Sequence, residues 1–108
     1  MNKQFTFRGM EHSNTLEEAA NNQLAKIERF LEHEKEPIYI HVTFTAGHTH
    51  AHHRVECQVV GPGYDHNAHR IGADMYELIT AVMDCMYLQL TEAKKKRINE
   101  RQTGIKRE

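Results

Sequence analysis

The sequence predicts an α+β domain with the element order β-α-β-β-β-α, in which two helices pack on one face of a four-stranded sheet. The spacing of apolar residues switches between two, which is typical of strands, and three or four, which is typical of helices. Each predicted helix has a single apolar stripe, so both can cover the same sheet. A Gly-Pro-Gly turn at 61–63 predicts a hairpin between the last two strands.

The first strand and the first helix are recognised by their periods. Phe5 and Phe7 alternate with polar residues and predict a short strand that ends at Gly9. The helix is expected to begin at a capping box, for which the candidates are Asn14 or Thr15 with Glu17 or Glu18. Its apolar stripe consists of Leu16, Ala20, Leu24, Ile27 and Leu31. Pro37 prevents the helix from continuing.

Three further strands follow. Residues 38–45 alternate strictly between apolar and polar side chains, which predicts a strand with one buried and one solvated face. The next strand is expected to bury Val55, Cys57 and Val59 and to expose His52, Arg54, Glu56 and Gln58. After the turn at 61–63, a fourth strand is predicted over about residues 64–71.

The last helix changes from apolar to basic along its length. Asp74 is its expected cap, and its apolar stripe consists of Met75, Ile79, Val82, Met86, Leu90 and Ala93. Residues 94–108 hold seven Lys or Arg side chains against two acidic ones, a net charge of +5. The first 93 residues hold seven basic and thirteen acidic side chains, a net charge of −6. This asymmetry indicates a polyanionic partner, although cations at a helix end also complement its dipole.

Length and composition restrict the class of protein. The 108 residues predict one domain at 1–99, followed by a basic tail at 100–108. Neither an apolar run of about 20 residues nor a signal peptide is visible, so we expect a cytoplasmic protein without a membrane partner. Cys57 and Cys85 lie inside apolar patterns, which indicates reduced core residues. Nothing in the pattern indicates a cofactor or a small-molecule substrate.

Two segments resemble a known family. They are Gly72-Ala73-Asp74-Met75-Tyr76-Glu77-Leu78-Ile79, with Gln89-Leu90 and the lysine run behind it, and Gln23-Leu24-Ala25-Lys26-Ile27-Glu28-Arg29-Phe30. Both resemble the ribosome hibernation-promoting factors, also described as protein Y, ribosome-associated inhibitor or sigma-54 modulation proteins, over residues 3 to about 99. The resemblance implies a non-enzymatic protein that binds ribosomal RNA of the small subunit in the mRNA and tRNA channel. It also implies a block of decoding under stress or in stationary phase, by a short-type factor that binds as a monomer.

The resemblance and the charge pattern together give candidate contacts with ribosomal RNA. Phosphate-rich RNA surfaces attract basic side chains, because each contact releases condensed counterions. The candidates are Lys26, Arg29, Lys94, Lys95, Lys96, Arg97 and Arg101. Possible additional contacts are His50, His52, Arg54 and Arg70. The alternative for Lys26 and Arg29 is an ordinary solvated helix face with pairing to nearby glutamates.

Other readings remain open. His48, His50 and His52 have the spacing of one strand face and are candidate metal ligands, with His41 or Glu56 as a candidate further ligand. A solvated sheet face is, however, also a normal place for histidine. A double-stranded RNA-binding module also packs two helices on an antiparallel sheet, as α-β-β-β-α. In that module, however, the lysines lie near the start of the last helix, whereas here they lie at its far end. No residue pattern favours an enzyme.

Overall fold

The computed structural model describes residues 1–49 and 52–107, with only the backbone described over 100–107. The elements follow the predicted order: β1 Asn2–Arg8, α1 Asn14–Leu31, β2 Tyr39–Thr45, β3 His53–Gly61, β4 Tyr64–Gly72 and α2 Met75–Arg107. The strands form one sheet in the order β1-β2-β3-β4. β1 and β2 are parallel, and the other neighbouring strands are antiparallel.

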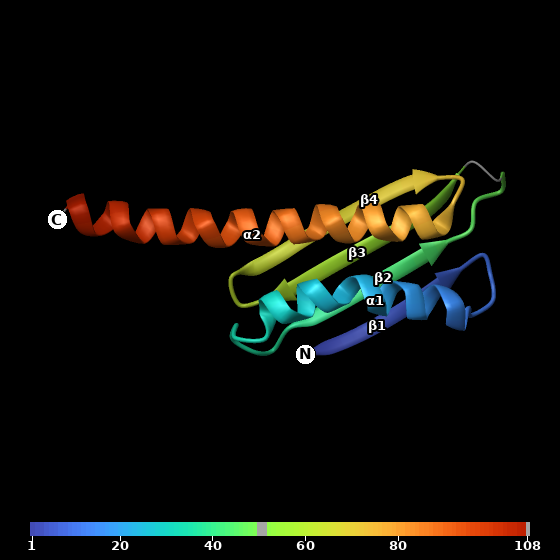
Figure 1. The fold of residues 1–108 in the computed structure, drawn as a ribbon, viewed down its shortest axis with the longest axis horizontal. Coiled ribbons are helices and arrows are strands. Elements are labelled where there is room, and N and C mark those ends of the chain that lie inside the picture. Colours follow the sequence, from blue (N-terminus) through green and yellow to red (C-terminus); the bar gives the residue numbers. More distant parts are fainter. Residues whose placement is uncertain (50–51, 108) are drawn as a thin grey trace.

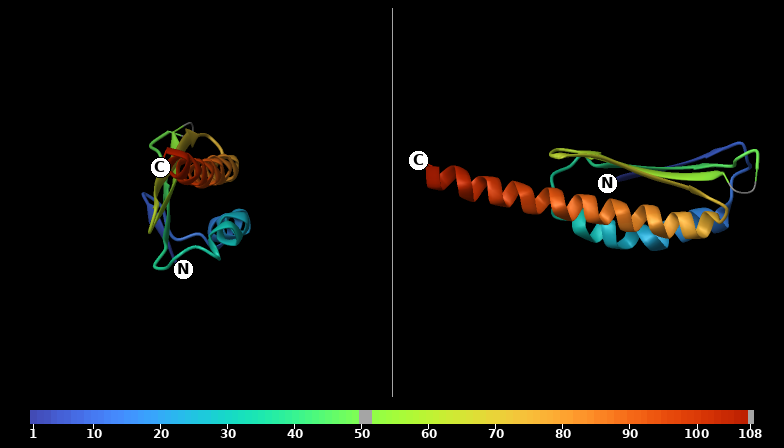
Figure 2. Two further views of the ribbon diagram at one scale, coloured as in Figure 1. Left: turned by 90° about the vertical axis from the view of Figure 1, so that its left-hand side faces the viewer. Right: turned by 90° about the horizontal axis from the view of Figure 1, so that it is seen from above.

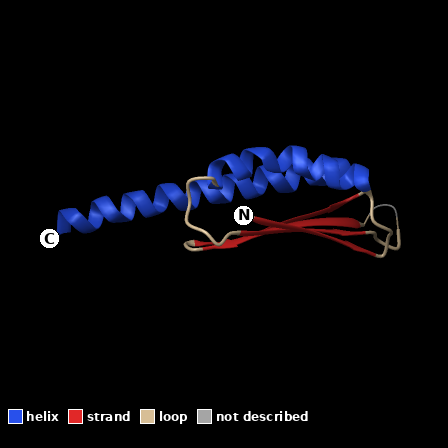
Figure 3. Ribbon diagram, turned by 90° about the horizontal axis from the view of Figure 1, so that it is seen from below, coloured by secondary structure: helices blue, strands red, loops and turns tan. Residues whose placement is uncertain are grey.

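Both helices lie on the same face of the sheet, as predicted (Figure 3). α1 lies over the β1 and β2 side, and α2 lies over the β3 and β4 side (Figure 1). The view along the long axis shows the two helices side by side on one side of the strands (Figure 2, left). No helix of the described residues covers the opposite face of the sheet (Figure 3), so every second side chain of β2 and β3 points toward solvent there.

The core lies between the sheet and the two apolar stripes. All five residues of the predicted α1 stripe are buried. The strands contribute Ile40, Val42 and Phe44 from β2 and Val55, Cys57 and Val59 from β3. The α2 stripe is buried from Met75 to Leu90, and Leu78 and Met83 widen it beyond the predicted set. The sequence pattern therefore predicted the buried faces of α1, β2 and β3, and that of α2 except for Ala93, which is only half-buried.

The hairpin between β3 and β4 is confirmed. Gly61 pairs with Tyr64, so the connection is the two residues Pro62 and Gly63. Gly63 has a φ of +84°, a left-handed conformation that glycine adopts without steric cost. This turn brings the start of β4 to the point where α2 leaves the sheet.

The structure corrects the start of one helix and confirms the start of the other. α1 is capped by Ser13 rather than Asn14 or Thr15, because the Ser13 hydroxyl accepts a hydrogen bond from the backbone N–H of Leu16 at 3.3 Å. The expected capping-box acid Glu17 instead contacts His12, at 2.6 Å between Oε2 and Nε2. The Asp74 cap of α2 is confirmed, with its carboxylate accepting from the N–H of Tyr76 at 2.9 Å.

α2 extends much farther than the sequence predicted. We expected it to end near residue 99, but the helix continues to Arg107. Glu100, Arg101 and Gln102, which follow directly, all have high helix propensity, so the sequence gives the helix no reason to end at residue 99. The segment predicted as a tail is therefore a continuation of α2 that projects beyond the sheet (Figure 2). Within the described residues, neither helix is long and apolar enough to cross a bilayer.

Val82 provides a test of this packing. Its side chain is fully buried between α2 and the sheet, so Val82→Asp places an unpaired carboxylate in the core. We expect the free energy of unfolding to fall by about 3 kcal/mol or more, measured by urea denaturation. The neighbouring Ala81 is exposed, so Ala81→Asp is the matched control. Equal stability of the two variants would contradict the assigned packing face of α2.

Candidate nucleic-acid interface

The basic run of α2 begins where the helix passes the turn between β3 and β4. Lys94 and Arg97 lie four and seven residues after the buried Leu90, so they continue the inward-facing stripe of the helix. A side chain at Gly63 would place its Cβ 2.6 Å from an Arg97 guanidinium nitrogen. The space that glycine leaves open at this turn is therefore occupied by Arg97.

Arg97 is held against Tyr64 of β4. Its guanidinium carbon lies 4.7 Å from the centre of the Tyr64 ring, within the range of a cation–π contact. One of its nitrogens donates a hydrogen bond to the Tyr64 hydroxyl at 2.7 Å. Arg97 was predicted as a contact for RNA, but in the free protein it joins α2 to the sheet.

The same hydroxyl connects β4 to the segment after α1. Tyr64 donates to the Glu34 carboxylate at 2.8 Å, and Lys94 lies 3.2 Å from the same oxygen. Burial by itself would raise the pKa of Glu34, but hydrogen bonds from Tyr64 and Lys94 and the charges of Lys94 and Arg97 lower it below its usual value. Burial, followed by the bond to Glu34, raises the pKa of Tyr64 to about 12. Tyr64 is therefore a neutral donor at physiological pH.

Three aromatic rings extend this cluster along the contact between the helices. Tyr87 of α2 meets Phe30 of α1 edge-on with ring centres 6.1 Å apart, and Phe30 meets Tyr64 at 6.3 Å. Each ring faces one cation: Lys26 lies 5.5 Å from Tyr87, and Lys94 lies 5.3 Å from Phe30. Lys26 also forms an ion pair with Asp84 of α2. Three of the predicted contacts, Lys26, Lys94 and Arg97, thus have partners inside the domain.

Arg29, Lys95 and Lys96 differ from these three cations. All three are exposed, and none forms an ion pair with a side chain of residues 1–49 or 52–99. Lys95 and Lys96 lie on α2 within two residues of Arg97, but on sides of the helix that do not face Tyr64. Arg101 lies on the projecting part of α2, where the structure describes only the backbone.

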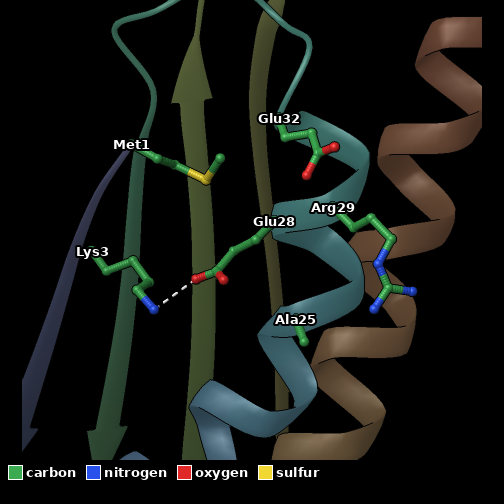
Figure 4. A pocket seen from close by; sticks show the side chains of 6 residues that line it. All are labelled: Met1, Lys3, Ala25, Glu28, Arg29 and Glu32. Atoms are coloured by element: carbon green, nitrogen blue, oxygen red, sulfur yellow. Dashed lines mark ion pairs between the residues drawn. The ribbon is translucent and has the colours of Figure 1, made fainter.

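Arg29 borders a shallow open hollow between the start of β1 and the end of α1. Figure 4 shows Glu28 directed toward Lys3 and Arg29 directed away from both. Lys3 and Glu28 form an ion pair at 2.7 Å, so those two charges compensate each other. Arg29, by contrast, is directed away from this pair (Figure 4).

Arg54 and Arg70 cannot belong to one RNA-binding surface of the sheet. In the sheet register Arg70 pairs with Val55, which places it on the helix-covered side of the sheet. Arg54 lies on the opposite, uncovered side, where it is 3.7 Å from Glu56. The two arginines were predicted together as additional contacts, but they lie on different faces of the sheet.

The predicted histidine strand is wrong. β2 ends at Thr45 and β3 begins at His53, so His48 and His52 lie in the connecting loop; His50 lies outside the described residues. His52 hydrogen-bonds to Thr49 at 2.6 Å, and His41 of β2 to Thr6 at 2.8 Å. Within the described part of the chain, no group of three His, Cys, Asp or Glu side chains has an arrangement that could hold a metal ion.

Comparison with known proteins gives a family match over nearly the whole chain. Residues 4–98 match the family described as "Sigma 54 modulation protein / S30EA ribosomal protein". The N-terminal domain of Protein Y from Thermus thermophilus superposes with a TM-score of 0.71 at 22% identity, covering 85% of this chain and 98% of that one. A ribosomal subunit interface protein from Coxiella burnetii gives 0.68 at 27% identity, covering 88% and 99%. No curated protein sequence is matched significantly.

The lowered pKa of Glu34 predicts a pH dependence of stability. Because its pKa in the folded chain lies below the usual 4.5, the carboxylate stabilises the fold above about pH 4.5, and this contribution is lost as pH falls through the folded pKa. We expect Glu34→Gln to lower the free energy of unfolding at pH 7 by about 1–2 kcal/mol. This difference from the unmodified protein should shrink below pH 4.5, as measured by urea denaturation.

The control for this experiment is Glu92→Gln, because Glu92 is an exposed glutamate of α2 and its replacement changes the net charge equally. It should change stability little at any pH. A Glu34 variant with the same stability as the unmodified protein between pH 3 and pH 7 would contradict the cluster.

Proposed function

The chain belongs to the sigma 54 modulation protein / S30EA ribosomal protein family, and we propose that it is a ribosome-associated hibernation factor that acts without catalysis. It binds ribosomal RNA of the small subunit in the mRNA and tRNA channel and blocks decoding under stress or in stationary phase. The observation that carries the proposal is the family match over residues 4–98, which covers nearly all of the sheet, all of α1, and α2 as far as its basic run. The proposal places the protein in the cytoplasm, bound to one ribosome as a monomer.

The charge distribution supports an RNA phosphate surface as the partner. The body of the chain is acidic, so a phosphate surface is attracted mainly to the end of α2. Arg29, Lys95 and Lys96 are exposed and form no ion pair with another side chain of residues 1–49 or 52–99, so none of them has to break such a pair to meet a phosphate. We assign the direct contacts to these three side chains and to Arg101, with smaller contributions from the partnered Lys26 and Lys94.

Shape supports the same proposal. α2 gives the molecule a longest dimension of 57 Å against 24 and 18 Å, so a basic rod projects from a narrow body. Such a form suits insertion into a channel lined by RNA, where recognition depends on shape and backbone charge rather than on base edges. β1, which forms one edge of the sheet beside β2, has no counterpart in the α-β-β-β-α order of the double-stranded RNA-binding alternative.

The proposal predicts that Lys95→Gln and Lys96→Gln each weaken binding to purified small ribosomal subunits. Each phosphate contact contributes about 0.7–0.9 to the slope of log Kd against log salt, so each variant should flatten that slope by this amount. The measurement is a filter-binding or sedimentation titration of the full chain over a series of KCl concentrations.

Arg8→Gln is the matched control for this titration. Arg8 is an exposed cation at the end of β1, remote from the projecting end of α2 (Figure 1). Its removal changes the net charge equally but should leave the salt slope unchanged. Equal effects of Lys95→Gln, Lys96→Gln and Arg8→Gln would mean that only net charge matters. Failure of the unmodified protein to bind ribosomal subunits at low salt would overturn the proposed function.

A further inference from the structure

The Tyr64 hydroxyl is shared between two segments that are distant in sequence. It donates to Glu34, which follows α1, and accepts from Arg97 near the projecting end of α2. Only 3% of the tyrosine is exposed, so this side chain cannot itself reach a nucleic acid. Its two hydrogen bonds use the single proton and one lone pair of the hydroxyl, which leaves the group satisfied.

This contact lies where α2 loses its apolar packing against the sheet. Up to Leu90 the apolar stripe fixes α2 to the sheet, but the helix then continues beyond the sheet with polar and charged residues (Figure 2). A helix end without apolar packing frays and changes direction at low cost in free energy. The bonds of Lys94 to Glu34 and of Arg97 to Tyr64 extend the attachment by two further turns.

The charges in the cluster favour retention of Arg97. Lys94 pairs with the Glu34 carboxylate directly, whereas Arg97 stacks on the Tyr64 ring and donates a hydrogen bond to its hydroxyl. If Arg97 turned to a phosphate, the ring would lose its cation and the hydroxyl would lose a donor. Lys95 and Lys96 reach solvent with no such loss. The cluster thus separates cations that hold the helix from cations that remain available.

We propose that Glu34, Tyr64 and Arg97 form a latch that fixes the direction of the end of α2 and thereby positions Lys95 and Lys96 on a phosphate surface. Arg97 is then a positioning residue rather than an RNA contact. The inference rests on the proposed function for its partner, but the latch itself is a property of the free protein. A fixed helix end binds more tightly because its ordering cost is met before the partner arrives.

Tyr64→Phe is the variant that tests the latch. It keeps the buried ring and its cation–π contact, removes the hydroxyl that joins Glu34 to Arg97, and changes no charge. Hydrogen exchange of the free protein should become faster at backbone amides of residues 91–99 and stay slow at residues 78–88. Binding to purified small ribosomal subunits should weaken roughly threefold to tenfold, the range expected for an ordinary hydrogen bond.

The salt dependence separates positioning from contact. Because Tyr64→Phe removes no phosphate contact, its slope of log Kd against log salt should equal that of the unmodified protein, whereas Lys96→Gln flattens the slope. Glu34→Gln retains an acceptor for the hydroxyl and should therefore accelerate exchange at residues 91–99 less than Tyr64→Phe does.

Each outcome decides the inference. Unchanged exchange at residues 91–99 in a folded Tyr64→Phe variant would show that the latch does not hold α2. Faster exchange with unchanged affinity would show that the latch holds α2 but does not position it for the ribosome. If the unmodified protein bound no ribosomal subunit, the proposed function and the positioning role would both fall, and hydrogen exchange alone would still decide whether the latch exists.

Discussion

The one-sided apolar face of the sheet is the constraint on which the other features depend. β2 and β3 bury one row of side chains each, so both helices must lie on that side and turn their apolar stripes toward it. This fixes the rotation of α2 about its own axis. Because a straight helix keeps that rotation along its length, residues 94 and 97 face inward as Leu90 does, although they are basic.

As a consequence, the basic side chains of residues 94–97 fall into two groups, of which one contacts the domain and the other is exposed. Lys94 and Arg97 meet Phe30, Glu34 and Tyr64, and they extend the core by aromatic and charged contacts where apolar residues end. Lys95 and Lys96 have the same chemistry but point elsewhere, so they stay exposed. The acidic body and the basic end of the chain are therefore joined by one partly buried cluster rather than being independent regions.

Much of the fold could be predicted from local pattern, because periods of two and 3.6 specify the buried faces directly. The apolar stripe of α1 was predicted in this way. The turn at 61–63 and the Asp74 cap were predicted from the residue types that turns and helix starts favour. The inward direction of Lys94 and Arg97 was also predictable from their spacing after Leu90, but their charge suggested solvent. The contact between Glu34 and Tyr64 joins residues 30 apart, and no local pattern indicates it. The alternation of the histidines predicted a strand, but alternation alone does not distinguish a strand from a loop, and His48 and His52 lie in the loop between β2 and β3.

The central claim is that position on α2, rather than charge alone, decides which cations meet RNA. A cryo-electron microscopy structure of the full chain on the small ribosomal subunit tests this most directly. We expect phosphate oxygens within hydrogen-bond distance of Lys95 and Lys96, with Arg97 still stacked on Tyr64 as in the free protein. An Arg97 side chain that has left Tyr64 to bind phosphate, with Lys95 and Lys96 in solvent, would contradict it.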